Sequence, residues 1–309
     1  MKYIFGPVNS RRLGLSLGID LLPPKICNFN CVYCEVGPTT LLTCERAEYT
    51  PTEEIIAEID YFTTDKAQMR PVDVFTITAS GEPTLHTGIG QIINHIKEKT
   101  TKPVCVLTNG SLLHLKDVRN DLMKADIVIP SLDAADPETY KKINRPASCA
   151  KLETIIQGLC RFRKEFTGKY LLEILIVKGL NDNQENIKAL KQAIKKIKPD
   201  LVQLNTVSRP APGNYAQPLD RNELNKLAAK LEGPVDVIGN FEKTNRKKRQ
   251  PVGEVEIISM LQRRPCTIDD VCEAFGAETA YARDIIEKLT KAGRLCKINH
   301  TGKTYYQPC

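Results

Sequence analysis

Between residues 17 and 231 the sequence alternates apolar, β-branched segments with amphipathic ones, and this alternation constrains the fold most strongly. We expect six strands, each followed by a helical segment, over residues 17–22, 72–78, 104–107, 126–132, 171–177 and 201–207. Such alternation produces a parallel sheet with right-handed crossovers. Six units are fewer than the eight that close a barrel. The prediction is therefore an α/β fold built as an open, partial (β/α)6 barrel.

The helical segments are predicted over residues 52–61, 89–99, 112–123, 137–143, 152–166, 184–197 and 221–231. In a parallel barrel the carboxyl ends of the strands meet at one face, and the chemistry of such folds lies there. Short polar motifs follow most of the predicted strands. We therefore expect the functional site at this face, with Asn205 and Arg209 after the sixth strand as its outer candidates.

Three cysteines, Cys27, Cys31 and Cys34, follow the first strand in a C-x3-C-x2-C spacing. A compact loop can direct three thiolates at one point, which is one ligand short of a four-cysteine site. Structural zinc closes its shell with four protein ligands, whereas an iron–sulfur cluster can leave one iron for an external ligand. His86 or Cys44 could complete a zinc site, so the spacing alone leaves both interpretations open.

Tyr33, between the last two cysteines, gives the loop the form CxxxCxφC with an aromatic φ. In spacing, aromatic residue and preceding strand, this segment resembles the signature of the radical S-adenosylmethionine (SAM) superfamily. The resemblance implies that Cys27, Cys31 and Cys34 hold a [4Fe-4S] cluster, and that SAM chelates the open iron through its amino and carboxylate groups. It also implies the same partial (β/α)6 barrel over residues 5–240.

The segment after the second strand is similar to the Gly-Gly-Glu-type motif of that family. It reads Gly81-Glu82-Pro83, with Ser80 in place of the first glycine. The resemblance implies that Glu82 or nearby carbonyls accept from the ammonium of SAM, on a backbone that allows close approach. Without the cysteine loop, the same residues would be read as a strand-to-helix turn.

Further candidates for the SAM site end the third, fourth and fifth strands: Thr108, Asn109, Ser131, Asp133 and Lys178. The resemblance implies that such residues hold the carboxylate and ribose hydroxyls of SAM, and Lys178 is a cation that can hold a SAM or substrate anion. Helix capping by the polar residues and a solvated lysine are the structural alternatives. No catalytic residue is identified.

Four segments are similar to those of radical SAM proteins related to wyosine synthases: SRRLGLSLGIDLLPPKICNFNCVYC, TASGEPTLH, TNGSLL and VKGLND. Wyosine synthases remodel a modified guanine in tRNA with pyruvate, and carry an additional N-terminal cysteine set for a second cluster. This chain has no cysteine before Cys27. The resemblance implies that the cluster, reduced by a reductase or a flavodoxin or ferredoxin donor, splits SAM. The products are methionine and a 5′-deoxyadenosyl radical that abstracts hydrogen from a substrate.

After a barrel over residues 1–242, residues 243–251 read as a basic linker, because 243–249 hold five basic residues and no apolar one. Residues 252–309 form a separate pattern of helices over 254–261, 267–275 and 278–292, followed by a hairpin around Gly302. These elements resemble a winged helix-turn-helix domain. Since the linker has the composition of a hinge, we expect this domain to be separable from the barrel.

The charges leave the substrate class open. The chain carries a net charge of +7, a bias toward anionic partners, and Arg11 and Arg12 can hold a carboxylate or phosphate or remain solvated. Residues 251–309 hold eight basic and eight acidic residues, unlike a DNA-reading domain with its basic face. The substrate is predicted to be tRNA or another nucleic acid, or alternatively a protein or peptide recruited by the C-terminal domain. A non-enzymatic iron–sulfur sensor is the third interpretation.

No apolar run approaches the length that spans a bilayer, and the segment MKYIFGPVNSRR lacks an apolar signal. We therefore expect a cytoplasmic protein with no membrane partner. Besides the three cluster ligands the chain has eight cysteines, and for a large intracellular chain we expect free thiols. Of these, Cys44 and Cys149 lie in loops on the predicted active face.

Overall fold

The computed structural model describes residues 1–10, 12–211, 216–238, 253–300 and 302–309. Within these ranges eight strands form one sheet in the order β1-β2-β5-β6-β7-β8-β9-β10. β1 is antiparallel to β2, and every later neighbour in the sheet is parallel. The strands are β1 (Ile4–Ser10), β2 (Gly14–Asp20), β5 (Val74–Thr78), β6 (Val104–Thr108), β7 (Ile127–Pro130), β8 (Lys169–Ile176), β9 (Leu201–Thr206) and β10 (Val235–Val237).

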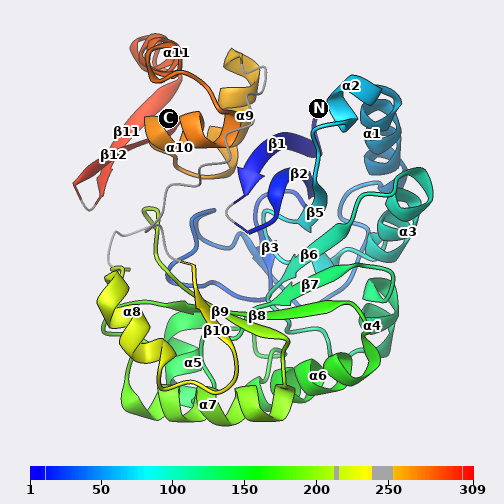
Figure 1. The fold of residues 1–309 in the computed structure, drawn as a ribbon, viewed down its shortest axis with the longest axis vertical. Coiled ribbons are helices and arrows are strands. Elements are labelled where there is room, and N and C mark those ends of the chain that lie inside the picture. Colours follow the sequence, from blue (N-terminus) through cyan, green and yellow to red (C-terminus); the bar gives the residue numbers. More distant parts are fainter. Residues whose placement is uncertain (11, 212–215, 239–252, 301) are drawn as a thin grey trace.

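Helices connect the parallel strands and lie along the outer face of the curved sheet (Figure 1). The connecting helices are α1 (Thr52–Thr64), α2 (Lys66–Met69), α3 (Ile89–Lys99), α4 (Lys116–Leu122), α5 (Pro137–Asn144), α6 (Leu152–Glu165), α7 (Gln184–Ile197) and α8 (Arg221–Ala228), with a short 3-10 turn over Pro83–Leu85. α7 shows why they pack this way, since Asn183 caps its amino end and its apolar residues, such as Leu190 and Ile194, are buried at helical spacing.

The predicted partial barrel is confirmed. The six predicted strands correspond to β2 and β5 to β9, and the sheet stays open because β1 and β10 are its two ends. The prediction missed both end strands. β1 contains Gly6 and Pro7, which are depleted in strands, and β10 has only three residues. Because the other strands run parallel, their carboxyl ends meet at one rim, as predicted.

The C-terminal module consists of α9 (Glu254–Arg263), α10 (Ile268–Phe275), α11 (Thr279–Lys291) and an antiparallel hairpin of β11 (Leu295–His300) and β12 (Lys303–Pro308). These are the elements, in the order, that the sequence predicts. The module has its own apolar core, formed by residues such as Ile257, Val271 and Ile286. The predicted linker 243–251 lies outside the described residues.

The module packs directly against the barrel at β1. Asn9 of β1 donates to the carbonyl oxygens of Glu273 (2.8 Å) and Ala274 (3.2 Å) at the end of α10. The Arg263 guanidinium lies 4.3 Å from the ring centre of Phe5. Figure 1 shows the module beside β1. The sequence gives no sign of this interface because β1 itself was not recognised as a strand.

Two disulfides also differ from the expected free thiols: Cys44 pairs with Cys149, and Cys296 with Cys309. The cysteines of the first pair are 105 residues apart in the chain, so only the fold brings them together. In the ranges that the structure describes, no helix has the length and apolar character needed to cross a membrane.

Candidate active site

A cavity of about 520 Å³ opens at the carboxyl ends of the parallel strands. Its lining includes all of the predicted site residues except one: Cys27, Cys31, Tyr33, Cys34, Gly81, Glu82, Pro83, Thr108, Asn109, Ser131 and Asp133. Residues as far apart in sequence as Cys27 and Asp133 are therefore gathered around one space.

Lys178 is the exception. Its ammonium donates to Glu223 Oε1 at 2.6 Å, and its side chain is 53% exposed. Lys178 lies two residues beyond the end of β8, where the chain has already turned toward the segment before α8, since its backbone N–H donates to the carbonyl of Gln217. The prediction that this cation points into the cavity does not match its position, and we leave it out of the proposed site.

The first cysteine is fixed between two neighbouring segments. The short strand β3 (Ile26–Cys27) pairs with β4 (Leu41–Leu42) on one side and with Gly81 on the other. A Cβ atom at Gly81 would lie 1.7 Å from the Ile26 carbonyl oxygen. Glycine is required here because the end of β5 must approach this backbone closely. This contact explains physically why a glycine precedes Glu82 in the motif.

The end of α5 supports the cysteine loop from the opposite side. The N–H groups of Asn30 and Val32 donate to the carbonyls of Asn144 (3.0 Å) and Ile143 (2.9 Å). Burial raises the pKa of Cys27 to about 12, and burial also raises the pKa of Cys31. Both thiols are therefore protonated at neutral pH in the unliganded loop, and they must release protons to bind iron.

Glu82 connects the ends of two strands. Its Oε1 accepts from the Thr84 N–H (3.0 Å) and from the hydroxyls of Thr84 and Thr108 (both 2.6 Å), while Oε2 accepts from the Asn109 N–H at 2.6 Å. The side chain is buried, and burial raises the pKa of its carboxyl against the effect of these donors. Glu82 therefore holds Thr108 and Asn109 in place at the end of β6.

Asp133 connects the cysteine loop to the end of β7. Its carboxylate accepts hydrogen bonds from the Tyr33 hydroxyl, the Asn144 amide and the Leu175 N–H. Burial raises the pKa of Asp133. Sequence reasoning found Tyr33 and Asp133 but missed Asn144, whose position at the end of a helix carries no recognisable signal.

The inner wall of the cavity carries a polar network below the strand ends. Arg12 Nη1 donates to Glu173 Oε2 at 3.0 Å and to Gln203 Oε1 at 2.8 Å, and Asn205 Nδ2 donates to Glu173 Oε1 at 3.1 Å. Arg12 thus binds a carboxylate of this chain, and its side chain is 20% exposed. Arg11 lies outside the described residues. Glu173, on β8, was not identified from the sequence because it interrupts an otherwise apolar strand with no motif around it.

The C-terminal module forms part of the same cavity wall through Met260, Arg264, Asp270, Glu273 and Ala274. A second connection runs through Arg209, the candidate after the sixth strand. Its guanidinium donates to Glu35 (3.2 Å), next to the last cysteine of the loop, and lies 3.6 Å from Asp270 of α10. The cavity is therefore bounded by both parts of the chain.

The two residues considered for a fourth zinc ligand are both engaged elsewhere. His86 Nε2 lies 2.7 Å from the Thr50 carbonyl oxygen, and His86 Nδ1 accepts from the Gly88 N–H at 3.0 Å. Cys44 is bonded to Cys149. Within the described ranges, no three histidine, cysteine or acidic side chains are grouped to hold a single metal ion.

The profile of the radical SAM superfamily matches residues 21–191. The chain belongs to the radical SAM superfamily. Members of the superfamily are enzymes that use a [4Fe-4S] cluster together with SAM. The donor set of this chain fits such a cluster, because three thiols line one cavity and neither His86 nor Cys44 is free to add a fourth ligand.

Two relatives can be aligned with nearly the whole of this chain. A UPF0026 protein of Methanocaldococcus jannaschii is 31% identical over 311 residues, which covers 99% of this chain and 96% of that protein. A protein of Brachyspira hyodysenteriae named GTPase Obg is 37% identical over 300 residues, which covers 95% of this chain but 43% of that protein. This chain therefore spans less than half of the second relative.

Two solved structures share the fold of the barrel. A radical SAM methyltransferase from Sphaerobacter thermophilus has a TM-score of 0.59 at 14% identity, covering 74% of this chain and 67% of the methyltransferase. TYW1 with a lysine–pyruvate adduct bound has a TM-score of 0.54 at 18% identity, covering 73% of this chain and 74% of TYW1. At such low identity the likeness concerns the fold alone.

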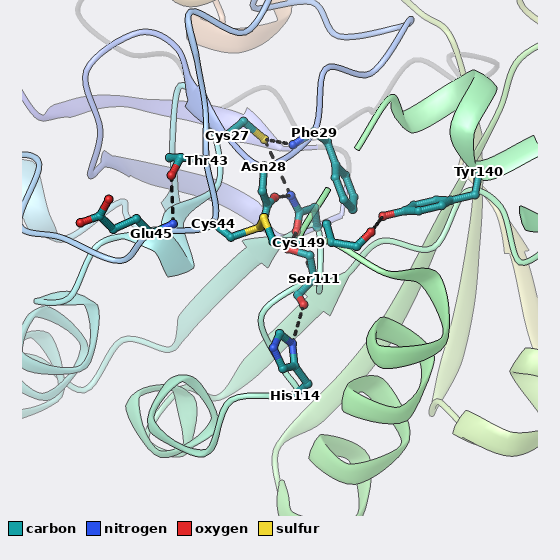
Figure 2. The surroundings of a disulfide bond; sticks show 12 residues. Cys27, Asn28, Phe29, Thr43, Cys44, Glu45, Ser111, His114, Tyr140 and Cys149 are labelled. Carbon is teal, nitrogen blue, oxygen red and sulfur yellow. Dashed lines mark hydrogen bonds between the residues drawn. A yellow bond between two sulfur atoms is a disulfide. The ribbon is translucent and has the colours of Figure 1, made fainter. Parts of the chain in front are cut away.

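The Cys44–Cys149 disulfide lies beside the cysteine loop, close to Cys27 and Asn28 (Figure 2). The residue before Cys44, Thr43, donates its N–H to the Cys27 carbonyl at 3.1 Å, and Ala147 donates to the Asn28 carbonyl at 2.9 Å. The disulfide thus links the two segments that hold the loop from either side.

We expect the oxidised apo-protein to lose about 2–4 kcal/mol of unfolding free energy when Cys44 and Cys149 are both replaced by serine, because a long loop of the unfolded chain is no longer closed. The measurement is denaturant unfolding without reductant, with Cys160→Ser as the control, since Cys160 is a free thiol on α6. Equal stability of the double variant and the parent would show that this disulfide does not form in solution.

Proposed function

We propose that this protein holds a [4Fe-4S] cluster on Cys27, Cys31 and Cys34 and binds SAM in the adjoining cavity for reductive cleavage. The observation that supports this most directly is that the three cysteines and the polar ends of four strands line one space. When bound and reduced, the cluster supplies the electron that cleaves SAM to methionine and a 5′-deoxyadenosyl radical. The residues of the chain bind, orient and shield these groups.

In this proposal the strand ends have separate tasks. Gly81 and Pro83 bring backbone close to the SAM amino group, while Glu82 acts as a positioning residue that keeps Thr108 and Asn109 directed at the cavity. Ser131 lies beside them, since its N–H donates to the Thr108 carbonyl. Asp133 orients the cysteine loop, because its carboxylate accepts from the Tyr33 hydroxyl of the loop and from the Asn144 amide at the end of α5.

We further propose that the substrate is tRNA or another nucleic acid, which is consistent with the net charge of +7. Because the C-terminal module walls one side of the cavity, a polymer would have to insert an end or a flipped-out unit to reach the radical. A protein or peptide substrate is the alternative. It is favoured by the balanced charge of residues 251–309 and by the shared fold of SuiB, which was solved with its precursor peptide at a TM-score of 0.51. The cluster would be reduced by a reductase or a flavodoxin or ferredoxin donor.

The first test is anaerobic reconstitution followed by reduction with dithionite in the presence of SAM. We expect one [4Fe-4S] cluster per chain and slow formation of 5′-deoxyadenosine and methionine without substrate. Retention of tRNA or of a polypeptide during anaerobic purification would then separate the two substrate classes. Stoichiometric zinc with no iron would contradict the proposal.

Replacing Glu82 by glutamine should leave the cluster intact and weaken SAM binding by about tenfold or more, because the loss of one charged hydrogen-bond acceptor costs about 1.5–3 kcal/mol. The NH₂ group of glutamine would face N–H and O–H donors where a carboxylate oxygen now accepts from them. The end of β6 would therefore shift. SAM affinity is measured by equilibrium dialysis on protein with full iron content. Glu165→Gln, on the outer helix α6, is the matched control. Unchanged SAM affinity in the fully loaded Glu82 variant would remove this residue from the SAM site.

A further inference from the structure

Asn144 ends α5 and is buried, with 3% of its surface exposed. Its backbone carbonyl accepts from Asn30, and this bond already supports the cysteine loop. Its side chain makes two further contacts, because Nδ2 lies 3.4 Å from Cys31 Sγ and 3.0 Å from Asp133 Oδ2. The backbone of Asn144 is enough to support the cysteine loop, so the two contacts of its side chain call for a separate explanation.

The neighbours of the amide fix its orientation. An amide nitrogen carries two N–H donors, whereas the amide oxygen only accepts. Asp133 Oδ2 is an acceptor, and a cysteine sulfur that ligates a cluster is a thiolate and only accepts. The nitrogen therefore faces both, with one N–H directed at each. Asp133 is itself held by Tyr33 and by the Leu175 N–H. The second N–H of Asn144 is thus directed at the Cys31 sulfur, because the buried Asp133 carboxylate takes the first and is held in turn by Tyr33 and Leu175.

At the first cysteine the backbone N–H of Phe29 lies 3.4 Å from Cys27 Sγ, and only the side-chain contact there is weaker. Asn109 Nδ2 lies 3.7 Å from Cys27 Sγ, but its stronger partner is Asn28 Oδ1 at 2.7 Å. Of these two amides, Asn144 is the one that lies closer to a ligand sulfur.

We propose that Asn144 is a positioning residue that raises the reduction potential of the cluster by donating an N–H to the Cys31 sulfur. Hydrogen bonds to cluster sulfurs are among the factors that set the potential of iron–sulfur proteins. Adding an electron increases the negative charge on the cluster and its sulfurs. A donor aimed at one sulfur therefore stabilises the reduced state more than the oxidised state. The inference rests on the proposed ligation by Cys27, Cys31 and Cys34.

The test is a redox titration of the reconstituted full-length protein, followed by the EPR signal of the reduced cluster in the absence of SAM. Two variants remove the donor: Asn144→Ala and the similarly sized Asn144→Leu. We expect their midpoint potentials to be more negative than that of the parent. At the parent midpoint, the ratio of reduced to oxidised cluster should fall about tenfold, the size expected for one hydrogen bond to a charged group.

Asn186→Ala is the matched control. Asn186 is also fully buried, and its side chain bonds backbone groups of residues 133–136 and 181 rather than a cysteine. An unchanged potential in both Asn144 variants would overturn the inference, and so would an equal shift in Asn186→Ala, because the effect would then come from general loosening.

If neither Asn144 variant assembles a cluster, the hydrogen bond is tested by pulsed EPR of the reduced parent protein. Its asparagines are labelled with ¹⁵N in the side chain only. Because Asn109 Nδ2 also lies near a ligand sulfur, the spectrum is recorded for Asn109→Leu as well. A hyperfine coupling to a side-chain nitrogen that persists in Asn109→Leu supports the hydrogen bond from Asn144, and its absence overturns it. A parent protein that binds no [4Fe-4S] cluster would instead contradict the proposed function, so the two failures are distinguishable.

Discussion

Replacing any one of Cys27, Cys31 and Cys34 by alanine should reduce the iron bound after anaerobic reconstitution from about four atoms per chain to nearly none. With two thiolates a cluster would lack one of its three protein ligands, and the two residues considered as a further ligand are not free to replace it. His86 has both ring nitrogens engaged, and Cys44 is paired. Iron and sulfide analysis, together with the EPR spectrum of the reduced protein, measure the loss.

Cys105→Ala is the matched control for these variants. Cys105 is a buried free thiol on β6 that does not line the cavity. The Cys105→Ala protein should keep the full iron content and lose a modest amount of unfolding free energy. Four irons in the triple variant of Cys27, Cys31 and Cys34 would show that the cluster is bound elsewhere.

Gly81→Ala should have the second-largest effect, because the added Cβ would lie 1.7 Å from a backbone oxygen. The clash is with a backbone oxygen, which cannot move aside as the end of a flexible side chain can. We expect a cost of about 3–5 kcal/mol, in the range of the most disruptive single substitutions. The strain acts on Ile26, directly before Cys27, so bound iron should fall several-fold and SAM binding should be lost. Iron content and thermal unfolding are measured together.

The matched control is Gly253→Ala. An added Cβ at Gly253 would meet only the flexible side chain of Glu256, at 3.1 Å, so stability and iron content should change little. A Gly81→Ala protein with normal iron content and normal SAM binding would mean that β3 is not held against the backbone of residue 81 in solution.

Local patterns of apolar and polar residues were sufficient to predict the six central strands of the barrel and the helices between them. The bounds of α3 and α7 agree with the sequence prediction because their apolar residues follow a helical period between clear ends. The elements that were missed depend on partners distant in sequence. β1 exists as a strand because it pairs with β2 and packs against the C-terminal module, and the Cys44–Cys149 pair depends on a loop more than a hundred residues away.

In the site, too, the sequence predicts less than the structure shows, because the contacts of individual atoms depend on residues distant in the chain. The motif around Glu82 is recognisable from sequence, yet the carboxylate is already engaged by four donors from Thr84, Thr108 and Asn109. A motif identifies the residue, but the atoms that remain available to a ligand depend on neighbours from other strands. Glu173 and Asn144 illustrate the converse, because each lies in the site through tertiary contacts and stands in no recognisable motif.

The wall contributed by α9 and α10 also has a consequence during biosynthesis. A ribosome completes β1 to β10, which end at Val237, before it begins the helices that carry Met260, Asp270 and Glu273. Domains generally fold in the order in which they are made. The cysteine loop and the strand ends therefore assemble around a chamber that still lacks one side. That side stays open to solvent until α9 and α10 have been made and have packed against β1.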